Sequence, residues 1–191
     1  MGIPWGLGCV MSLNAKHAEF LIQQLDVLVV DDNAYMRHLV RSLLLNIGVK
    51  SVVEAADGIA GLEAIRTVSP DIVVLDWEMP LLNGPEFVRI VRSPGVFPVP
   101  DIPIVMLSGH GERWRIVEAV RLGVNEFLCK PVSAKALQER LISIVAKPRP
   151  SVQLGKYYGP EPRNMLVDKL AQTEAGAAQP EPEQKSIAPA A

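Results

Sequence analysis

Acidic, hydroxyl and amino side chains follow four apolar runs of this sequence. They are Asp31-Asp32, Asp76, Ser108 and Lys130. Each stands where a short apolar run ends, and runs of this kind, several of them led by β-branched residues, are typical of buried strands. An Asp after a strand often only caps the next helix or begins a turn, and Asp76 alone would favour that role. The combination of all four positions is what indicates chemistry.

Three carboxylates that converge without compensation repel one another and raise one another's pKa. A hard divalent cation and an ammonium group would hold them ionised; Mg²⁺ prefers such oxygen ligands, and Lys130 carries the ammonium. A cation, a lysine, a hydroxyl and a free carboxylate describe a phosphoryl-transfer site. In such a site the carboxylate attacks phosphorus while the metal and the lysine neutralise the equatorial oxygens. The hydroxyl of Ser108 would then hydrogen-bond the attached group.

Five repeats of strand-then-helix would position these residues. The predicted strands cover residues 27–30, 50–54, 72–75, 102–107 and 126–129. The predicted helices cover residues 36–47, 57–68, 84–91, 114–122 and 133–145. This alternation predicts an α/β fold with a parallel five-stranded sheet, helices on both faces and right-handed crossovers. All four polar stretches would then meet at the carboxyl edge of the sheet, where ligands bind in open α/β folds.

Composition narrows the class of protein. The chain has 191 residues, 49% of them hydrophobic, and a formal net charge of -2. This charge gives no basic field for nucleic acid, and no apolar run approaches the length of a membrane span. The first ten residues lack the basic region of a signal peptide. The cysteines, Cys9 and Cys129, have no metal-type spacing, and Cys129 is predicted to be a buried thiol. We therefore expect a cytoplasmic protein.

The sequence divides into three parts. Residues 1–24 are predicted to be a leader, partly helical or disordered, in which Met1 or Met11 could be the first residue. Residues 25–146 form the folded domain. Residues 147–191 are a Pro- and Ala-rich tail that is predicted to be largely disordered, because residues 171–191 contain no large apolar residue except Ile187.

Over about residues 25–146 the chain resembles the receiver domain of two-component response regulators, of the stand-alone type found in chemotaxis. The matching features, in order, are Asp31-Asp32, Asp76-Trp77-Glu78-Met79-Pro80 with Gly84, Ser108-Gly109, and Phe127 with Lys130-Pro131. The resemblance implies the flavodoxin-like strand order 2-1-3-4-5. It also implies a signalling domain rather than an enzyme, and a cis peptide bond between Lys130 and Pro131.

The resemblance implies a role for each site residue. Asp76 would accept the phosphoryl group. Mg²⁺ would be bound by Asp32, Asp76 and the backbone carbonyl of Glu78, with Asp31 helping through water. Lys130 would pair with the phosphoryl group. Ser108 and Phe127 would form a switch that changes the face made by the fourth helix, the fifth strand and the fifth helix, where a downstream protein would read the state.

Several residues have more than one interpretation. Glu78 could reach the metal or the phosphoryl group and alter phosphoryl lifetime, and His110 could tune access or be a solvated loop residue. Arg37 and Arg41 could meet the phosphodonor or form a solvated basic face. Trp114 is predicted to be a partly exposed packing residue, although aromatic residues are enriched at interface centres.

The tail offers a second, partial resemblance. Residues 157–163 are similar to an aromatic-x-Gly-Pro-Asp-Arg-Arg tail of some single-domain receivers, with Pro162 in place of the first Arg. This segment could dock or fold back on the domain, or be a turn-rich linker.

Three functions are compatible with such a fold. In the first, the domain takes a phosphoryl group from a histidine kinase or a histidine phosphotransfer protein and signals through protein contacts or relays the phosphate. In the second, it is a pseudo-receiver that serves as an interaction scaffold without the chemistry. In the third, the crevice binds a flavin, although Asp31-Asp32 would repel its phosphate.

Overall fold

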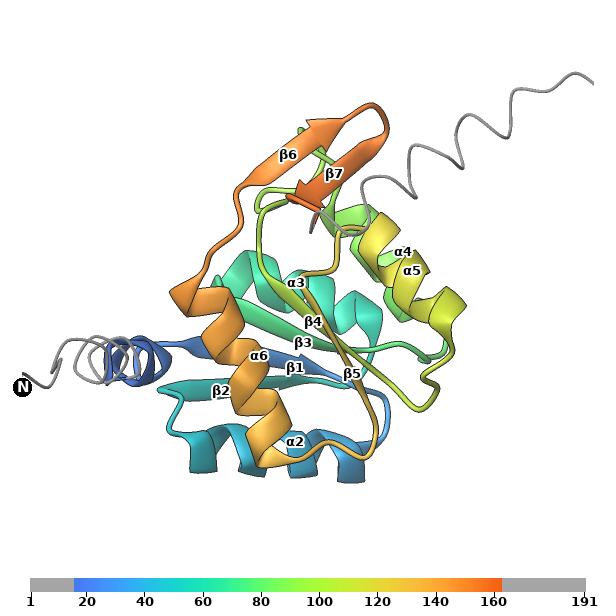
Figure 1. Ribbon diagram of the computed structural model, residues 1–191. Coiled ribbons are helices and arrows are strands. Elements are labelled where there is room, and N and C mark those ends of the chain that lie inside the picture. The colour runs from blue at the N-terminus through green and yellow to red at the C-terminus, as the bar shows by residue number, and fades with distance from the viewer. Residues whose placement is uncertain (1–15, 163–191) are drawn as a thin grey trace, which may run out of the picture. The chain divides into compact units, whose positions relative to one another are not determined.

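The computed structural model describes residues 16–162, which contain a five-stranded parallel sheet in the order β2-β1-β3-β4-β5 (Figure 1). The strands are β1 (Asp26–Val30), β2 (Ser51–Ala55), β3 (Ile72–Asp76), β4 (Ile104–Ser108) and β5 (Glu126–Cys129). Helices cover both faces of the sheet. The predicted fold class and strand order are therefore confirmed, and the predicted strand bounds differ from these by at most two residues.

Five helices pack on the sheet because successive side chains of a strand point to opposite faces. Along β1, Leu28 and Val30 join one core cluster, while Val27 and Val29 join the other. The first cluster lies under α3 (Gly58–Val68), α4 (Gly84–Val91) and α5 (Arg113–Arg121). The second lies under α2 (Ala34–Ile47) and α6 (Ala134–Ala146). The middle strands β3 and β4 are buried throughout, as strands covered on both faces require.

Local sequence signals place the helix ends. The side chains of Asn33, Asp57, Asn83 and Ser133 each accept a hydrogen bond from a backbone N–H of the first turn of the helix that follows. The first helix of the repeats, α2, ends at Gly48, whose φ of 98° lies in the left-handed region that glycine adopts without strain. Each cap residue stands at the end of the loop that joins a strand to the next helix. The cap therefore helps to fix the position of the polar residues in that loop at the sheet edge.

A hairpin follows α6 and corrects part of the prediction for the tail. Strands β6 (Ser151–Leu154) and β7 (Tyr157–Pro160) pair antiparallel, inside the segment predicted to be largely disordered. The Tyr158 hydroxyl donates to the Asp101 carboxylate, and the backbone at Gly159 lies against Gly123. Residues 157–160 thus fold back on the domain. Composition did not predict this, because the hairpin is held by hydrogen bonds and close backbone contacts rather than by a large apolar face. Residues 163–191 lie outside the described part.

Arg92 links three loop segments at the end of the domain where the hairpin lies. The residue is 7% exposed, and its guanidinium donates to the backbone oxygens of Gly123 and Pro100 and to the side-chain oxygen of Asn125. The same Asn125 oxygen accepts from the backbone N–H of Ile104 at the start of β4. Burial lowers the pKa of Arg92 to about 10, so the group stays charged at neutral pH. These contacts lie at the amino end of β4, away from the edge that carries Asp76.

Three smaller predictions can be compared with the structure. A helix that includes residues 16–22 precedes β1, with Ile22 buried against the α2 side of the sheet, while residues 1–15 lie outside the described part. The thiol of Cys129 is exposed, so the prediction of a buried thiol was wrong: this residue ends the edge strand β5, where the sheet offers no further cover. No helix within residues 16–162 has the length and apolar character needed to cross a membrane.

Candidate functional site

Three carboxylates and one ammonium group meet at the carboxyl edge of the sheet. Asp31 and Asp32 follow β1, Asp76 ends β3, and one carboxylate oxygen from each lies within 4.8 Å of the others. Lys130, directly after β5, places its Nζ 2.9 Å from Asp31 Oδ2 and 2.9 Å from Asp76 Oδ1. Asp31 and Asp76 are almost fully buried, whereas Asp32 is exposed. The structure thus brings these four side chains together.

Burial and the neighbouring charges shift the pKa values of Asp76 and Lys130 in opposite directions. Burial raises the pKa of the Asp76 carboxyl above its usual range, although the Lys130 ammonium and the backbone N–H of Trp77 lower it. Burial alone would lower the pKa of Lys130, but its hydrogen bonds to Asp31 and Asp76 outweigh burial and raise it. Lys130 therefore stays charged between two carboxylates. The peptide bond between Lys130 and Pro131 is cis, as the resemblance implied.

Replacing Asp76 with Asn is expected to stabilise the protein at pH 7 when a chelator removes divalent cations. The pKa of Asp76 is raised in the folded state, so the unfolded chain releases this proton at a lower pH than the folded protein does. Wild type therefore loses stability as the pH rises toward the folded pKa, whereas Asp76→Asn has no proton to release at this position. Each pH unit between the two pKa values corresponds to about 1.4 kcal/mol. Chemical denaturation of both proteins from pH 3 to 8 would measure the difference.

The higher stability of Asp76→Asn should disappear below the ordinary pKa of an Asp carboxyl, about 3.9, because Asp76 is then protonated in both the folded and the unfolded wild type. The exposed Glu63→Gln on α3 is the matched carboxylate-to-amide control and should stay within about 0.5 kcal/mol of wild type throughout. A lower stability of Asp76→Asn at pH 7 would contradict the expectation.

The predicted switch residues lie on neighbouring strands. Ser108 ends β4 with no exposed surface, and its Oγ accepts a hydrogen bond from the backbone N–H of His110 at 3.1 Å. Phe127 on β5 is partly buried, and its ring meets the Trp77 ring edge-to-face at a centroid distance of 6.2 Å. Trp77 directly follows Asp76. The buried Trp77 indole, next to Asp76 in the chain, thus contacts the Phe127 ring.

Glu78 is turned toward α5, not toward the aspartates. Its Oε1 lies 2.9 Å from Arg115 Nη1 and 3.8 Å from His110 Nε2. Arg115 also lies 3.6 Å from Glu112 and stacks over the rings of Trp77 and Trp114, at 5.3 Å and 5.0 Å. Sequence reasoning missed Arg115, because its partner Glu78 is distant along the chain. The His110 side chain is half exposed, and its ring nitrogens lie 3.8 Å from Glu78 Oε1 and 3.6 Å from Glu112 Oε1.

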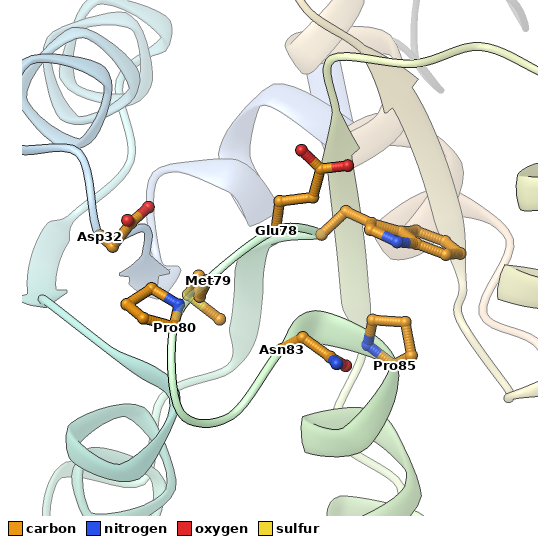
Figure 2. A pocket seen from close by; sticks show the side chains of 7 residues that line it. Asp32, Glu78, Met79, Pro80, Asn83 and Pro85 are labelled. Carbon is orange, nitrogen blue, oxygen red and sulfur yellow. The ribbon is translucent and has the colours of Figure 1, made fainter.

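A pocket of about 410 Å³ opens beside the cluster (Figure 2). Asp32, Met79 and Pro80 lie together on one side of it, with Asn83 and Pro85 on the other (Figure 2). Gly84 permits the close turn of this loop, since a Cβ there would lie 2.5 Å from the backbone oxygen of Asp76. The pocket therefore gives a bound group access to the exposed carboxylate of Asp32.

The arginines of α2 are engaged within the domain. Arg37 donates to the backbone oxygen of Asp31 at 2.7 Å and pairs with Glu54 at 3.3 Å. Arg41 also pairs with Glu54, at 3.3 Å. The interpretation of a merely solvated basic face is therefore wrong for Arg37, which holds the loop that carries Asp31.

Comparisons with known proteins agree with this geometry. Residues 27–142 match the family model of the response regulator receiver domain. The chain is 33% identical over 124 residues to the chemotaxis protein CheY-3 of Vibrio cholerae, covering 65% of this chain and 94% of that protein. It is 33% identical over 118 residues to CheY of Pseudomonas aeruginosa, covering 62% and 94%. The solved structure of CheY4 of Vibrio cholerae matches with a TM-score of 0.58 and 30% identity, covering 64% of this chain and 99% of that one.

The chain therefore belongs to the response regulator receiver family, the phosphorelay domains of two-component systems. Within that family it is similar to the CheY-type chemotaxis receivers of bacteria, which the match covers almost from end to end.

Proposed function

We propose that Asp76 accepts a phosphoryl group from the phosphohistidine of a histidine kinase or a histidine phosphotransfer protein. The domain then signals through changed protein contacts or passes the phosphate on. The observation that carries this proposal is the placement of Lys130 Nζ at 2.9 Å from both Asp31 and Asp76. A pure interaction scaffold would have no physical need for a partly buried ammonium between two carboxylates.

In the transfer step, Asp76 attacks phosphorus with a carboxylate oxygen. Its Oδ1 is bound by Lys130 and by the backbone N–H of Trp77, so Oδ2 is the oxygen that these contacts leave for attack. The O–P bond forms, the P–N bond to the donor imidazole breaks, and the leaving nitrogen takes a proton from solvent water. Lys130 neutralises charge on the transferred oxygens, and the Ser108 hydroxyl hydrogen-bonds one of them.

The donor set suits Mg²⁺. The three carboxylate oxygens all lie within 4.8 Å of one another, a limit little more than twice the Mg–O distance of about 2.1 Å. Asp32, Asp76 and the backbone carbonyl of Glu78 would bind the ion directly, and Asp31 through water. When bound, the ion supplies positive charge that offsets the three carboxylates and the phosphoryl oxygens. Glu78 can take part through its carbonyl while its carboxylate pairs with Arg115.

Ser108 and Phe127 would carry the signal to the face formed by α5, β5 and α6. A shift of the Ser108 hydroxyl toward the phosphoryl group would leave space beside β4, and the Phe127 ring already packs edge-to-face on Trp77. We propose that a downstream protein binds this face according to the phosphorylation state. We also propose a cytoplasmic location.

The test is phosphorylation by acetyl phosphate, followed by intact mass. Wild type should gain one phosphoryl group when Mg²⁺ is present and none when EDTA replaces it. Asp76→Asn should gain none in either condition. The exposed Asp71→Asn is a matched control that should behave as wild type does.

Either an adduct on Asp76→Asn or one that forms equally well without Mg²⁺ would contradict the assignment. If wild type forms no adduct, beryllofluoride is titrated while amide chemical shifts are recorded. Binding of beryllofluoride would show that acetyl phosphate is an unsuitable donor, and no binding would show that the site cannot hold a phosphoryl group. Failure of both would favour the scaffold function.

A further inference from the structure

A groove of about 830 Å³ runs between α4 and α5, on the face of α5 that meets α4 rather than β5 and α6. Along α5 the positions 114, 117, 118 and 121 follow helical spacing and line one wall. Arg89 of α4 lies opposite, and its Nη2 is 3.3 Å from Glu118 Oε1. The two helices lie side by side in Figure 1, joined by this ion pair.

Trp114 is the large apolar side chain of this groove. It is 57% exposed, yet its ring meets the buried Trp77 edge-to-face at 6.3 Å and carries the Arg115 guanidinium at 5.0 Å. A tryptophan held on one side and exposed on the other loses little freedom on binding a partner. Such preorganised aromatic residues dominate the energetics of protein interfaces. Trp114 therefore has the properties of a binding anchor as well as those of the predicted packing residue.

The charge around the groove is positive. Arg89 and Arg113 line it together with a single lining acid, Glu118, which pairs with Arg89. Arg121 also lines the groove but has a partner of its own. This local excess stands out in a chain whose formal net charge is -2. The overall charge and the apolar residues Trp114 and Val117 favour a protein segment over a phosphate backbone.

We propose that the groove docks a segment of a partner protein in which an aromatic or aliphatic anchor stands beside Asp or Glu residues. The anchor packs on Trp114 and Val117, and the acids meet Arg113 at the amino end of α5. This surface is separate from the α5, β5 and α6 face assigned above, and its occupation does not require a phosphoryl group on Asp76.

A random peptide library displayed on phage, selected against the full chain, tests the proposal. Recovered sequences should carry acidic residues next to an apolar anchor. Synthetic copies should bind Trp114→Ala about thirtyfold more weakly than wild type, and the exposed charge reversal Arg113→Glu about tenfold more weakly. The matched control Ile116→Ala, on the exposed part of α5 outside the groove, should stay within about threefold. Fluorescence anisotropy of labelled peptides would measure each affinity.

Asp76→Asn should bind the same peptides as wild type, so loss of phosphorylation and loss of docking are separate results. Recovery of peptides without acids, affinity unchanged in both Trp114→Ala and Arg113→Glu, or a library that yields no binder would each overturn the proposal. So would self-association of the chain that Trp114→Ala abolishes in sedimentation, because the occupant would then be a second copy. Arg113→Glu changes an exposed side chain, which keeps the test valid if Trp114→Ala fails to fold.

Discussion

Lys130→Met is expected to form the phosphoryl adduct with acetyl phosphate about a hundred to a thousand times more slowly than wild type. The ammonium lies 2.9 Å from Asp76 Oδ1, where it would offset the charge that develops on the transferred oxygens. Loss of one preorganised donor at a developing charge typically costs this factor. The rate of adduct formation, followed by intact mass at saturating Mg²⁺, measures the effect.

The same substitution leaves two buried carboxylates facing each other. Breaking a buried ion pair costs about 3–5 kcal/mol, and the lower value applies because the Lys130 side chain is 19% exposed. Mg²⁺ should restore part of this stability, since it supplies positive charge at the same carboxylates. Lys135→Met, an exposed lysine on α6, is the matched control for both measurements. A folded Lys130→Met that reacts within threefold of the wild-type rate would remove Lys130 from the proposed chemistry.

Gly123→Ala is expected to lower the free energy of unfolding by about 3 kcal/mol, which shifts the melting temperature by roughly 10 °C. Gly123 has a φ of 89°, and a left-handed residue other than glycine costs about 1–2 kcal/mol. A Cβ at this position would also lie 2.6 Å from the backbone oxygen of Tyr158 in β7 and 3.2 Å from Arg92 Nε. The added cost of overpacking is about 1–3 kcal/mol. Thermal and urea unfolding would measure the total.

Gly95→Ala separates the two costs. Gly95 also has a positive φ, 78°, but a Cβ there meets nothing within 4 Å, so only the backbone strain of about 1 kcal/mol applies. The difference between the two variants reports how tightly the hairpin docks. Limited proteolysis within residues 147–161 should accelerate in Gly123→Ala and not in Gly95→Ala. Equal losses of stability in the two variants would show that the contact between Gly123 and the hairpin contributes nothing to stability.

The sequence by itself determined the fold and the membership of the acidic cluster. Apolar runs that alternate with amphipathic helices leave a doubly covered parallel sheet as the arrangement that buries both kinds of face. Once the sheet is parallel, the residues that follow its strands must meet at one edge. For this reason Asp31, Asp76 and Lys130 could be identified before their distances were known.

Only the tertiary structure decided which partners distant residues take. Arg115 pairs with Glu78 and stacks on two tryptophans, and no periodicity links these positions. The exposure of Cys129 depends on β5 being an edge strand, which its own residues do not reveal.

The hairpin of β6 and β7 is another feature that only the tertiary structure revealed. Its strands are short and its composition is that of a linker, but its backbone at Tyr158 and Gly159 lies against Gly123, whose carbonyl accepts from Arg92. Local sequence determines where a strand or helix begins and ends. Long-range packing determines what each exposed or charged side chain can do, because that depends on atoms contributed by other elements.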